Sequence, residues 1–211
     1  MKKILTRGEA AAVVGRLTIA YPDVKSGLSF QSIWELLISV VLSAQTTDVS
    51  VNKVTPELFG RWPDPPALAA ANDTEVAEVI RTIGLYRTKS ANIVRLARKL
   101  LDDFGGEVPQ DFDKLTSLPG VGRKSANVVL AFGFGEERMP VDTHVFRVAN
   151  RIGLCHENTP EKTETALVKC IPKGKLSDSH HYMIWHGRKV CHARKPECDA
   201  CVLNDLCLYV R

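Results

Sequence analysis

The chain has 211 residues, which is enough for one large domain or two small ones. Hydrophobic residues make up 45% of the sequence, a share typical of a globular protein that buries a core. The formal net charge of +4 suits a polyanionic partner but fits a mildly basic soluble enzyme equally well, so charge alone excludes neither.

No targeting signal or membrane span is visible in the sequence. Residues 1–6 lack the apolar core of a signal peptide. The most apolar stretch, residues 33–42, is interrupted by two polar residues and is too short to cross a bilayer. We therefore expect a cytoplasmic protein without a membrane partner, in which the cysteines stay reduced. Cys155 and Cys170, which stand alone, are interpreted as small core residues.

Helical signals run along nearly the whole chain, and no stretch alternates as a strand does, so the predicted fold class is all-α. Ser32 and Glu35 have the spacing of a capping box at the start of the apolar helix. The next helix begins near Asp48, and Pro56 is expected to end or kink it.

One motif occurs twice. Residues 89–94, Lys-Ser-Ala-Asn-Ile-Val, return as residues 124–129, Lys-Ser-Ala-Asn-Val-Val. Each copy follows a glycine-containing turn, and the first helix is expected to stop at the glycine pair 105–106. We interpret the copies as two related helix–turn–helix units, although chance similarity of two amphipathic helices gives the same pattern.

The turn at residues 118–122 is the most informative segment of the chain. Gly120 and Gly122 flank Val121, and glycines permit backbone angles closed to other residues and let another backbone approach closely. The helix that follows presents free N–H groups and the positive end of its dipole, which suits a DNA phosphate. These three residues are predicted to contact a DNA backbone, although a plain tight turn has the same sequence.

Lys124 lies in the first turn of the helix that follows this turn. The helix dipole disfavours a cation there, which favours the neutral amine that a nucleophile needs. An ordinary phosphate-contacting lysine is the alternative. Lys89 has the same downstream neighbours but only one glycine ahead of it, so Lys124 is the better candidate.

A carboxylate suited to partner this lysine follows at Asp142, before a helix whose apolar residues repeat at helical spacing. Facing Lys124, Asp142 would stabilise the positive charge that develops on a sugar as its base departs. The alternative is that Asp142 or Thr143 only caps the helix. A further helix is predicted to begin at Thr159, with a proline and an acidic residue in its first turn.

Four cysteines crowd into the C-terminal segment, separated by six, two and five residues: Cys191, Cys198, Cys201 and Cys207. Zinc sites usually pair two short cysteine knuckles across a longer loop, and only one short pair is present, so a 4Fe–4S cluster is favoured over zinc. The loop between the first two ligands carries Arg194 and Lys195, which are predicted to contact phosphates unless the loop is simply solvated. Nearby His180, His181 and His186 are interpreted as packing or hydrogen-bonding residues.

The hairpin at residues 118–124, the Val-Asp-Thr-His motif at 141–144 and the Cys-x6-Cys-x2-Cys-x5-Cys tail together resemble the endonuclease III family of DNA glycosylases. The resemblance covers nearly the whole chain. It implies two helical domains with a DNA groove between them. One is a six-helix barrel with the helix-hairpin-helix, at residues 23–135, and the other is an iron–sulfur cluster domain formed by residues 1–22 and 136–211.

The resemblance also implies the chemistry. By position, Lys124 is the nucleophile that forms a Schiff base at the sugar C1′, and Asp142 is the catalytic carboxylate. Gln45 would fill the gap left by an extruded base, and Leu85 would wedge into the opposite stack. The implied activity is that of a bifunctional glycosylase and apurinic/apyrimidinic lyase of base excision repair, which removes oxidised pyrimidines and nicks the strand by β-elimination. The expected partner is double-stranded DNA with damaged pyrimidines or abasic sites, bound by a monomer in the nucleoid.

Two other functions fit part of the pattern. The related adenine glycosylases share the hairpin, the aspartate and the cluster, but they lack the lysine and carry a further C-terminal domain, whereas this sequence has Lys124 and runs only four residues past Cys207. A non-catalytic DNA-binding module with a structural or redox-sensing cluster is the other alternative. The combination of Lys124 with Asp142 favours an enzyme.

Overall fold

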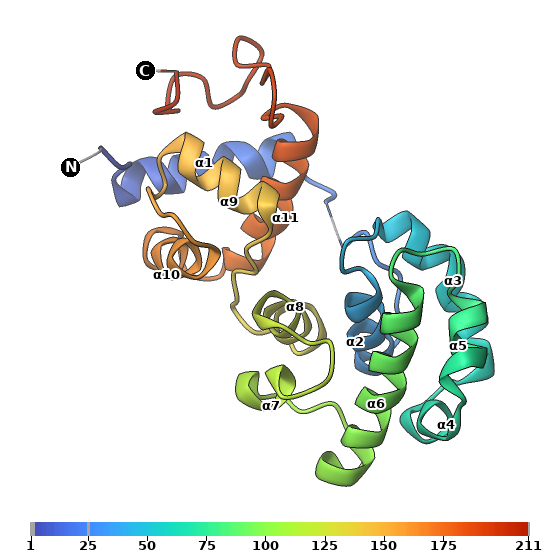
Figure 1. Cartoon of the computed structure of the whole chain (residues 1–211). Coiled ribbons are helices and arrows are strands. Elements are labelled where there is room, and N and C mark those ends of the chain that lie inside the picture. The colour runs from blue at the N-terminus through green and yellow to red at the C-terminus, as the bar shows by residue number, and fades with distance from the viewer. Residues whose placement is uncertain (1–2, 25, 211) are drawn as a thin grey trace. The chain divides into compact units, whose positions relative to one another are not determined.

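The computed structural model describes residues 3–24 and 26–210, and every regular element within them is a helix (Figure 1). The all-α prediction is confirmed for these residues. The chain divides into two units, residues 26–135 and residues 1–25 with 136–211. The helices in chain order are α1 (Arg7–Ala20), α2 (Ile33–Leu42), α3 (Asp48–Arg61), α4 (Pro65–Ala70), α5 (Asp73–Val79), α6 (Tyr86–Phe104), α7 (Phe112–Thr116), α8 (Arg123–Gly133), α9 (Thr143–Ile152), α10 (Pro160–Cys170) and α11 (Leu176–Lys189).

The unit of residues 26–135 is built around α2, because most residues of this apolar helix are buried and α3, α6 and α8 pack against it. Ser32 caps α2 as predicted, accepting a hydrogen bond from Glu35 N at 3.1 Å. The predicted capping box is only half formed, because the Glu35 carboxylate accepts from Gln31 N at 2.7 Å instead of from the Ser32 backbone.

Pro56 was expected to end or kink its helix; it lies inside α3 and does not end it, so the first of these two alternatives is wrong. Val51 and Val54 before the proline and Leu58 after it are all buried in the same core cluster. Burial of this continuous apolar face offsets the backbone hydrogen bond that a proline removes.

The two copies of the repeated motif begin helices that follow short turns. The pairs α5–α6 and α7–α8 are helix–turn–helix units whose members pack against each other. The glycine pair ends α6 as predicted, with Gly105 in a left-handed conformation at φ 63°. The structure thus agrees with the interpretation of two helix–turn–helix units, and α6 begins at Tyr86, before the first copy of the motif.

The unit of residues 1–25 and 136–211 joins the two ends of the sequence. α1 packs against α11, and α9 packs against both α10 and α11 (Figure 1). Leu5 N donates to Gly153 O at 2.8 Å, which ties the start of α1 to the end of α9. Thr159 caps α10 as predicted, accepting from Lys162 N at 3.3 Å. Residues 190–210, which follow α11, form turns and are held by side chains from the helices.

Both units have cores of their own, so each is a compact body. The structure divides after residues 25 and 135, and the expected boundaries were residues 22 and 135. Cys155 is buried in the core of the unit that contains the chain ends, and the half-buried Cys170 packs against the same core. The interpretation of both as packing residues is confirmed.

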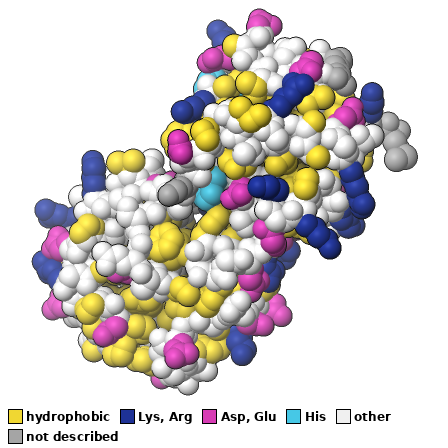
Figure 2. Space-filling view, turned by 180° about the vertical axis from the view of Figure 1, so that it is seen from behind, with side chains coloured by type: hydrophobic (Ala, Val, Ile, Leu, Met, Phe, Trp, Pro, Cys, Tyr) yellow, Lys and Arg dark blue, Asp and Glu magenta, His cyan; other side chains and the backbone are white. Residues whose placement is uncertain are grey.

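The distribution of charged side chains on the surface does not single out a binding face. Figure 2 shows Lys and Arg side chains spread over both parts of the chain on the face in view, with Asp and Glu side chains between them. None of the described helices combines the length and the apolar composition that crossing a membrane requires.

Candidate functional site

The turn between α7 and α8 requires a glycine at position 120. Gly120 has φ +80°, in the left-handed region that side chains rarely adopt. A Cβ atom at this position would lie 3.1 Å from Val41 Cγ1 and 3.3 Å from Asn92 Nδ2. The turn is therefore packed closely onto α2 and α6, which confirms that position 120 needs a glycine, whereas contact of Gly120 with DNA stays a prediction.

The backbone of Gly122 and the burial of Val121 differ from what the sequence predicted for this turn. Gly122 is the N-cap of α8 with φ −96°, a conformation open to any residue, and a Cβ there would meet no atom within 4 Å. The expectation that Gly122 needs special backbone angles is wrong. Val121 is buried in the core, and its N–H donates to Leu118 O at 3.1 Å. Neither its side chain nor its N–H is therefore available to another molecule. The open space at Gly122 is the part of the turn that a phosphate can approach.

Lys124 is exposed at the beginning of α8, next to this open space. Gly122 has no side chain to cap α8, so the N–H groups of the first helical turn have no side-chain acceptor at the cap. The positive end of a helix dipole favours an anion. Lys124 therefore lies at a helix start that suits a phosphate, and its role as the nucleophile stays a prediction.

Lys89, at the same place in the other copy of the motif, is buried: its exposed fraction is only 4%. Its Nζ donates a hydrogen bond of 2.6 Å to Thr46 Oγ1, and burial lowers the pKa of its ammonium. A buried amine engaged inside the protein cannot reach a sugar. The two lysines therefore have different environments, a difference that the sequence did not show.

Gln45 and Leu85 lie in adjacent loops of the same unit. Both are exposed and both have left-handed backbones, with φ 54° and φ 59°. Non-glycine residues in this region cost about 1–3 kcal/mol each and cluster at functional sites. A Cβ built on Gly84 would lie 3.8 Å from Gln45 O and 3.9 Å from Thr46 Oγ1, so the two loops touch. The large apolar side chain of Leu85 is 58% exposed, which suits insertion into another apolar surface.

Asp142 caps α9, since its Oδ1 accepts a hydrogen bond from Val145 N at 2.7 Å. The helix-cap alternative is therefore part of its role, and Asp142 rather than Thr143 is the cap. The side chain remains partly exposed, and the cap uses one of its two carboxylate oxygens. Asp142 belongs to the unit with the chain ends, whereas Lys124 belongs to the other unit.

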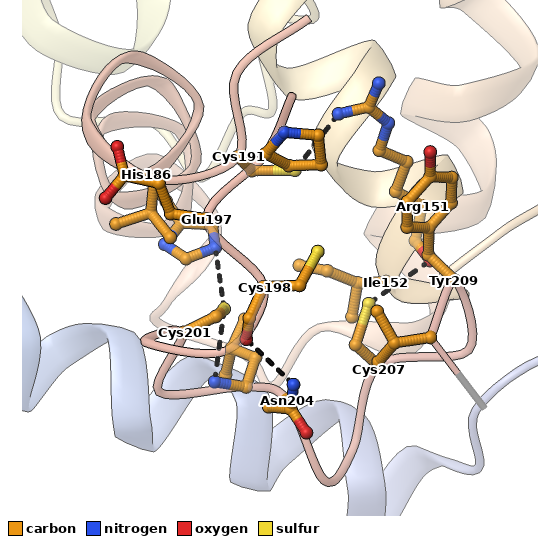
Figure 3. A pocket seen from close by; sticks show the side chains of 14 residues that line it. Arg151, Ile152, His186, Cys191, Glu197, Cys198, Cys201, Asn204, Cys207 and Tyr209 are labelled. Atoms are coloured by element: carbon orange, nitrogen blue, oxygen red, sulfur yellow. Dashed lines mark hydrogen bonds between the residues drawn. The ribbon is translucent and has the colours of Figure 1, made fainter. Parts of the chain in front are cut away.

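The four C-terminal cysteines line one pocket: Cys191, Cys198, Cys201 and Cys207. In Figure 3 their side chains surround a common space. Among the described residues, no three His, Cys, Asp or Glu side chains are grouped closely enough to hold one metal ion. Each thiolate of a 4Fe–4S cluster binds its own iron atom, so its four sulfurs need not converge on a single point. This arrangement fits the cluster.

Two groups that approach the cysteine pocket were not identified as its neighbours from the sequence. His186 is buried, with Nε2 at 3.5 Å from Cys201 Sγ and Nδ1 at 3.1 Å from Tyr21 Oη. Burial lowers the pKa of His186 to about 4, so the imidazole is neutral at pH 7. Its interpretation as a hydrogen-bonding residue is confirmed. Arg151 Nη1 lies 3.6 Å from Cys191 Sγ, and a charged group there offsets the negative charge of thiolates (Figure 3).

Arg151 also shapes the loop that carries Arg194 and Lys195. Its guanidinium donates to His192 O at 2.6 Å and to Ala193 O at 2.9 Å, so the loop is anchored on α9. Arg194 and Lys195 are exposed beyond this anchor. Their contact with DNA stays a prediction. The regular spacing of Arg147 and Arg151 on one face of α9, both donating to this segment, is the sequence signal that points to the anchor.

Comparison with known families adds to this geometry. Residues 38–173 match the HhH-GPD superfamily of base excision DNA repair proteins, and residues 191–207 match the iron–sulfur binding domain of endonuclease III. The second match begins and ends at the outer two of the four pocket cysteines.

Individual relatives cover almost the whole chain. Endonuclease III of Escherichia coli strain K12 is 44% identical over 97% of this chain and 97% of its own length. Endonuclease III of Rickettsia conorii is 45% identical over 89% of this chain and 90% of its own. A solved structure of a trapped endonuclease III–DNA covalent intermediate, the estranged-adenine complex, has a TM-score of 0.92 and 44% identity, covering 98% of each chain.

Proposed function

This chain belongs to the endonuclease III family of the helix-hairpin-helix base excision DNA repair proteins, and from that premise we propose which residues carry the reaction. The protein is a DNA glycosylase with apurinic/apyrimidinic lyase activity, and it carries a 4Fe–4S cluster. One observation supports the assignment of residues most strongly. An exposed lysine follows the closely packed Gly120 turn, while its buried counterpart Lys89 is engaged within the protein.

Lys124 is the nucleophile in this proposal. Its neutral amine attacks the sugar C1′, the bond from C1′ to the base breaks, and the base leaves with the bonding electrons and takes up a proton. The C1′–O4′ bond of the sugar ring then breaks, O4′ takes up a proton, and a Schiff base between Nζ and C1′ results. This Schiff base makes the C2′ hydrogen acidic, so that removal of this proton expels the 3′ phosphate and nicks the strand. Hydrolysis then releases Lys124. The open backbone at Gly122 receives a phosphate of the same strand.

Asp142 is the carboxylate that faces the reacting sugar. It stabilises the positive charge that develops on the sugar as the base departs, and it assists the proton transfers. Its hydrogen bond to Val145 N fixes the side chain and supports this role, because a carboxylate held before the reaction needs no reorganisation during it.

Gln45 and Leu85 assist extrusion of the damaged nucleotide. Unstacking a base costs a few kcal/mol, and insertion of an apolar wedge and a polar filler offsets that cost. Their exposed, left-handed positions in touching loops support these roles. The proposed substrate is duplex DNA with oxidised pyrimidines or abasic sites. The enzyme acts as a monomer on the nucleoid in the cytoplasm, and Arg194 and Lys195 contact phosphates outside the lesion.

The four cysteine thiolates hold the cluster. When bound, the cluster supplies covalent links across residues 191–207, a segment of turns with little regular structure of its own. Arg151 and His186 approach two of the four ligands and fix this segment against α9 and α11. The cluster thereby keeps the loop of Arg194 and Lys195 in place.

The protein purified without chelator is expected to be brown, with a broad absorption band at about 400 nm. The variant Cys198→Ser removes one ligand and should lose this band, whereas Cys155→Ser, which alters a core cysteine, should keep it. The visible spectrum and the iron content per chain measure both. A colourless native protein with stoichiometric zinc would contradict the cluster assignment.

Matched oligonucleotides test the activity. The native protein should release the base and nick the strand of a duplex with one thymine glycol, should nick a duplex with one abasic site, and should leave the undamaged duplex intact. Heating in alkali cleaves the strand wherever a base has been released. Denaturing gel electrophoresis of heated and unheated samples therefore distinguishes base release from nicks made by the enzyme itself. Binding of all three duplexes without cleavage of any would favour the non-catalytic DNA-binding module.

A further inference from the structure

The structure contains a link between the two loops that carry Gln45 and Leu85. The residue after Gln45 is Thr46, and its Oγ1 accepts the 2.6 Å hydrogen bond from Lys89 Nζ. Lys89 stands one helical turn after Leu85 in α6, and Lys89 N donates to Leu85 O at 3.0 Å. One lysine therefore contacts the Leu85 loop through its backbone and the Gln45 loop through its side chain.

We propose that Lys89 is a positioning residue, which together with Thr46 holds Gln45 and Leu85 at the spacing needed to extrude a nucleotide. This inference rests on the function proposed for Gln45 and Leu85. Both residues have strained backbones, and strained loops persist only when the surrounding structure fixes them. The Lys89–Thr46 bond is the side-chain contact that fixes one loop on the other.

The surroundings of Lys89 argue against a role in stability alone. Burial of an ammonium is costly unless the charge is paired, and a hydroxyl is a poor substitute for a carboxylate. Within residues 3–24 and 26–210, no ion pair of Lys89 with an acidic side chain is found, and burial lowers the pKa of the amine. Replacement of such a residue by an apolar one of similar length is expected to leave stability unchanged or to increase it. We attribute the burial of Lys89, despite its energetic cost, to its role in positioning the Gln45 and Leu85 loops.

The variant Lys89→Met keeps the length of the side chain and removes the donor, and Thr46→Val keeps the shape and removes the acceptor. Thr46→Ser retains the hydroxyl. The matched control is Lys99→Met, which alters a partly exposed lysine of the same helix that pairs with Asp103. Single-turnover base release is measured with saturating enzyme on thymine glycol in two duplexes: paired opposite adenine, and unpaired in a one-nucleotide bulge, where less work is needed for extrusion.

We expect Lys89→Met and Thr46→Val each to slow release from the paired duplex about tenfold, because small displacements of positioning residues have large effects on rate. On the bulged duplex both should stay within about threefold of native, since extrusion is then nearly free. The double variant should be no slower than either single variant, Thr46→Ser should recover the native rate, and Lys99→Met should not differ from native. Thermal unfolding of Lys89→Met should occur at the native temperature or above it.

Equal losses on both duplexes would overturn the inference, because general damage to the fold does not distinguish them. Native rates of Lys89→Met on the paired duplex would overturn it as well, and would leave the proposed function intact. A native protein that releases the base from neither duplex would instead overturn the proposed function, and this inference with it.

Discussion

Lys124→Ala is expected to abolish covalent trapping with abasic-site DNA. Borohydride reduces the Schiff base between an amine and the sugar C1′, so a native chain should form a stable complex with the DNA strand. Without the Lys124 amine no Schiff base forms, and base release and strand cleavage should fall at least about a thousandfold, as is typical when a covalent nucleophile is removed. Denaturing electrophoresis of the borohydride-treated mixture measures trapping, and single-turnover assays measure the rates.

Two further variants separate the nucleophile from a phosphate contact. Lys124→Arg keeps the positive charge at the start of α8, and it should keep DNA affinity while losing trapping, because a guanidinium does not form the Schiff base. Lys89→Met should still be trapped, because the amine it removes is buried and bonded to Thr46. Trapping that persists in Lys124→Ala would place the nucleophile at another residue.

The sequence was sufficient for features that depend on local chemistry. Ser32 and Thr159 cap their helices because a side-chain oxygen at an N-cap satisfies a free N–H in any tertiary setting. The same holds for the glycine that ends α6, since the left-handed conformation is a local property. The four cysteines were recognised because their spacing alone restricts what they can bind.

Features that depend on packing between distant segments were missed or wrong. Pro56 was expected to end or kink its helix, and α3 continues past it, because the apolar face of α3 is buried on both sides of the proline, which the sequence does not show. Gly122 was grouped with Gly120, yet only Gly120 has its backbone pressed against α2 and α6. The burial of Lys89 depends on Thr46, which is far from it in the sequence, and no residue pattern signals such a contact. The distance between Lys124 and Asp142 stays a prediction for the same reason, because it depends on how two units meet.

The second large effect is expected for Asp142→Asn, which should slow base release at least about a hundredfold. Loss of a residue that stabilises developing charge or transfers protons typically costs about 10²–10⁴ in rate. Asparagine caps helices about as well as aspartate, so the hydrogen bond to Val145 N and the stability of α9 should be kept. The substitution therefore removes the charge and leaves the cap. Single-turnover base release, DNA affinity and the unfolding temperature are the measurements.

Asp64→Asn is the matched control, because Asp64 caps α4 with the same geometry: its Oδ1 accepts from Ala67 N at 2.8 Å, and it is exposed. Both variants should unfold near the native temperature and bind DNA with native affinity, and only Asp142→Asn should lose base release. If Asp142→Asn keeps the native rate, the residue is a helix cap and the charge on the sugar is stabilised by another group. If both variants lose activity together with stability, the loss of activity results from weakened helix caps. A loss confined to Asp142→Asn means that the carboxylate acts on the sugar and that its role exceeds that of a helix cap.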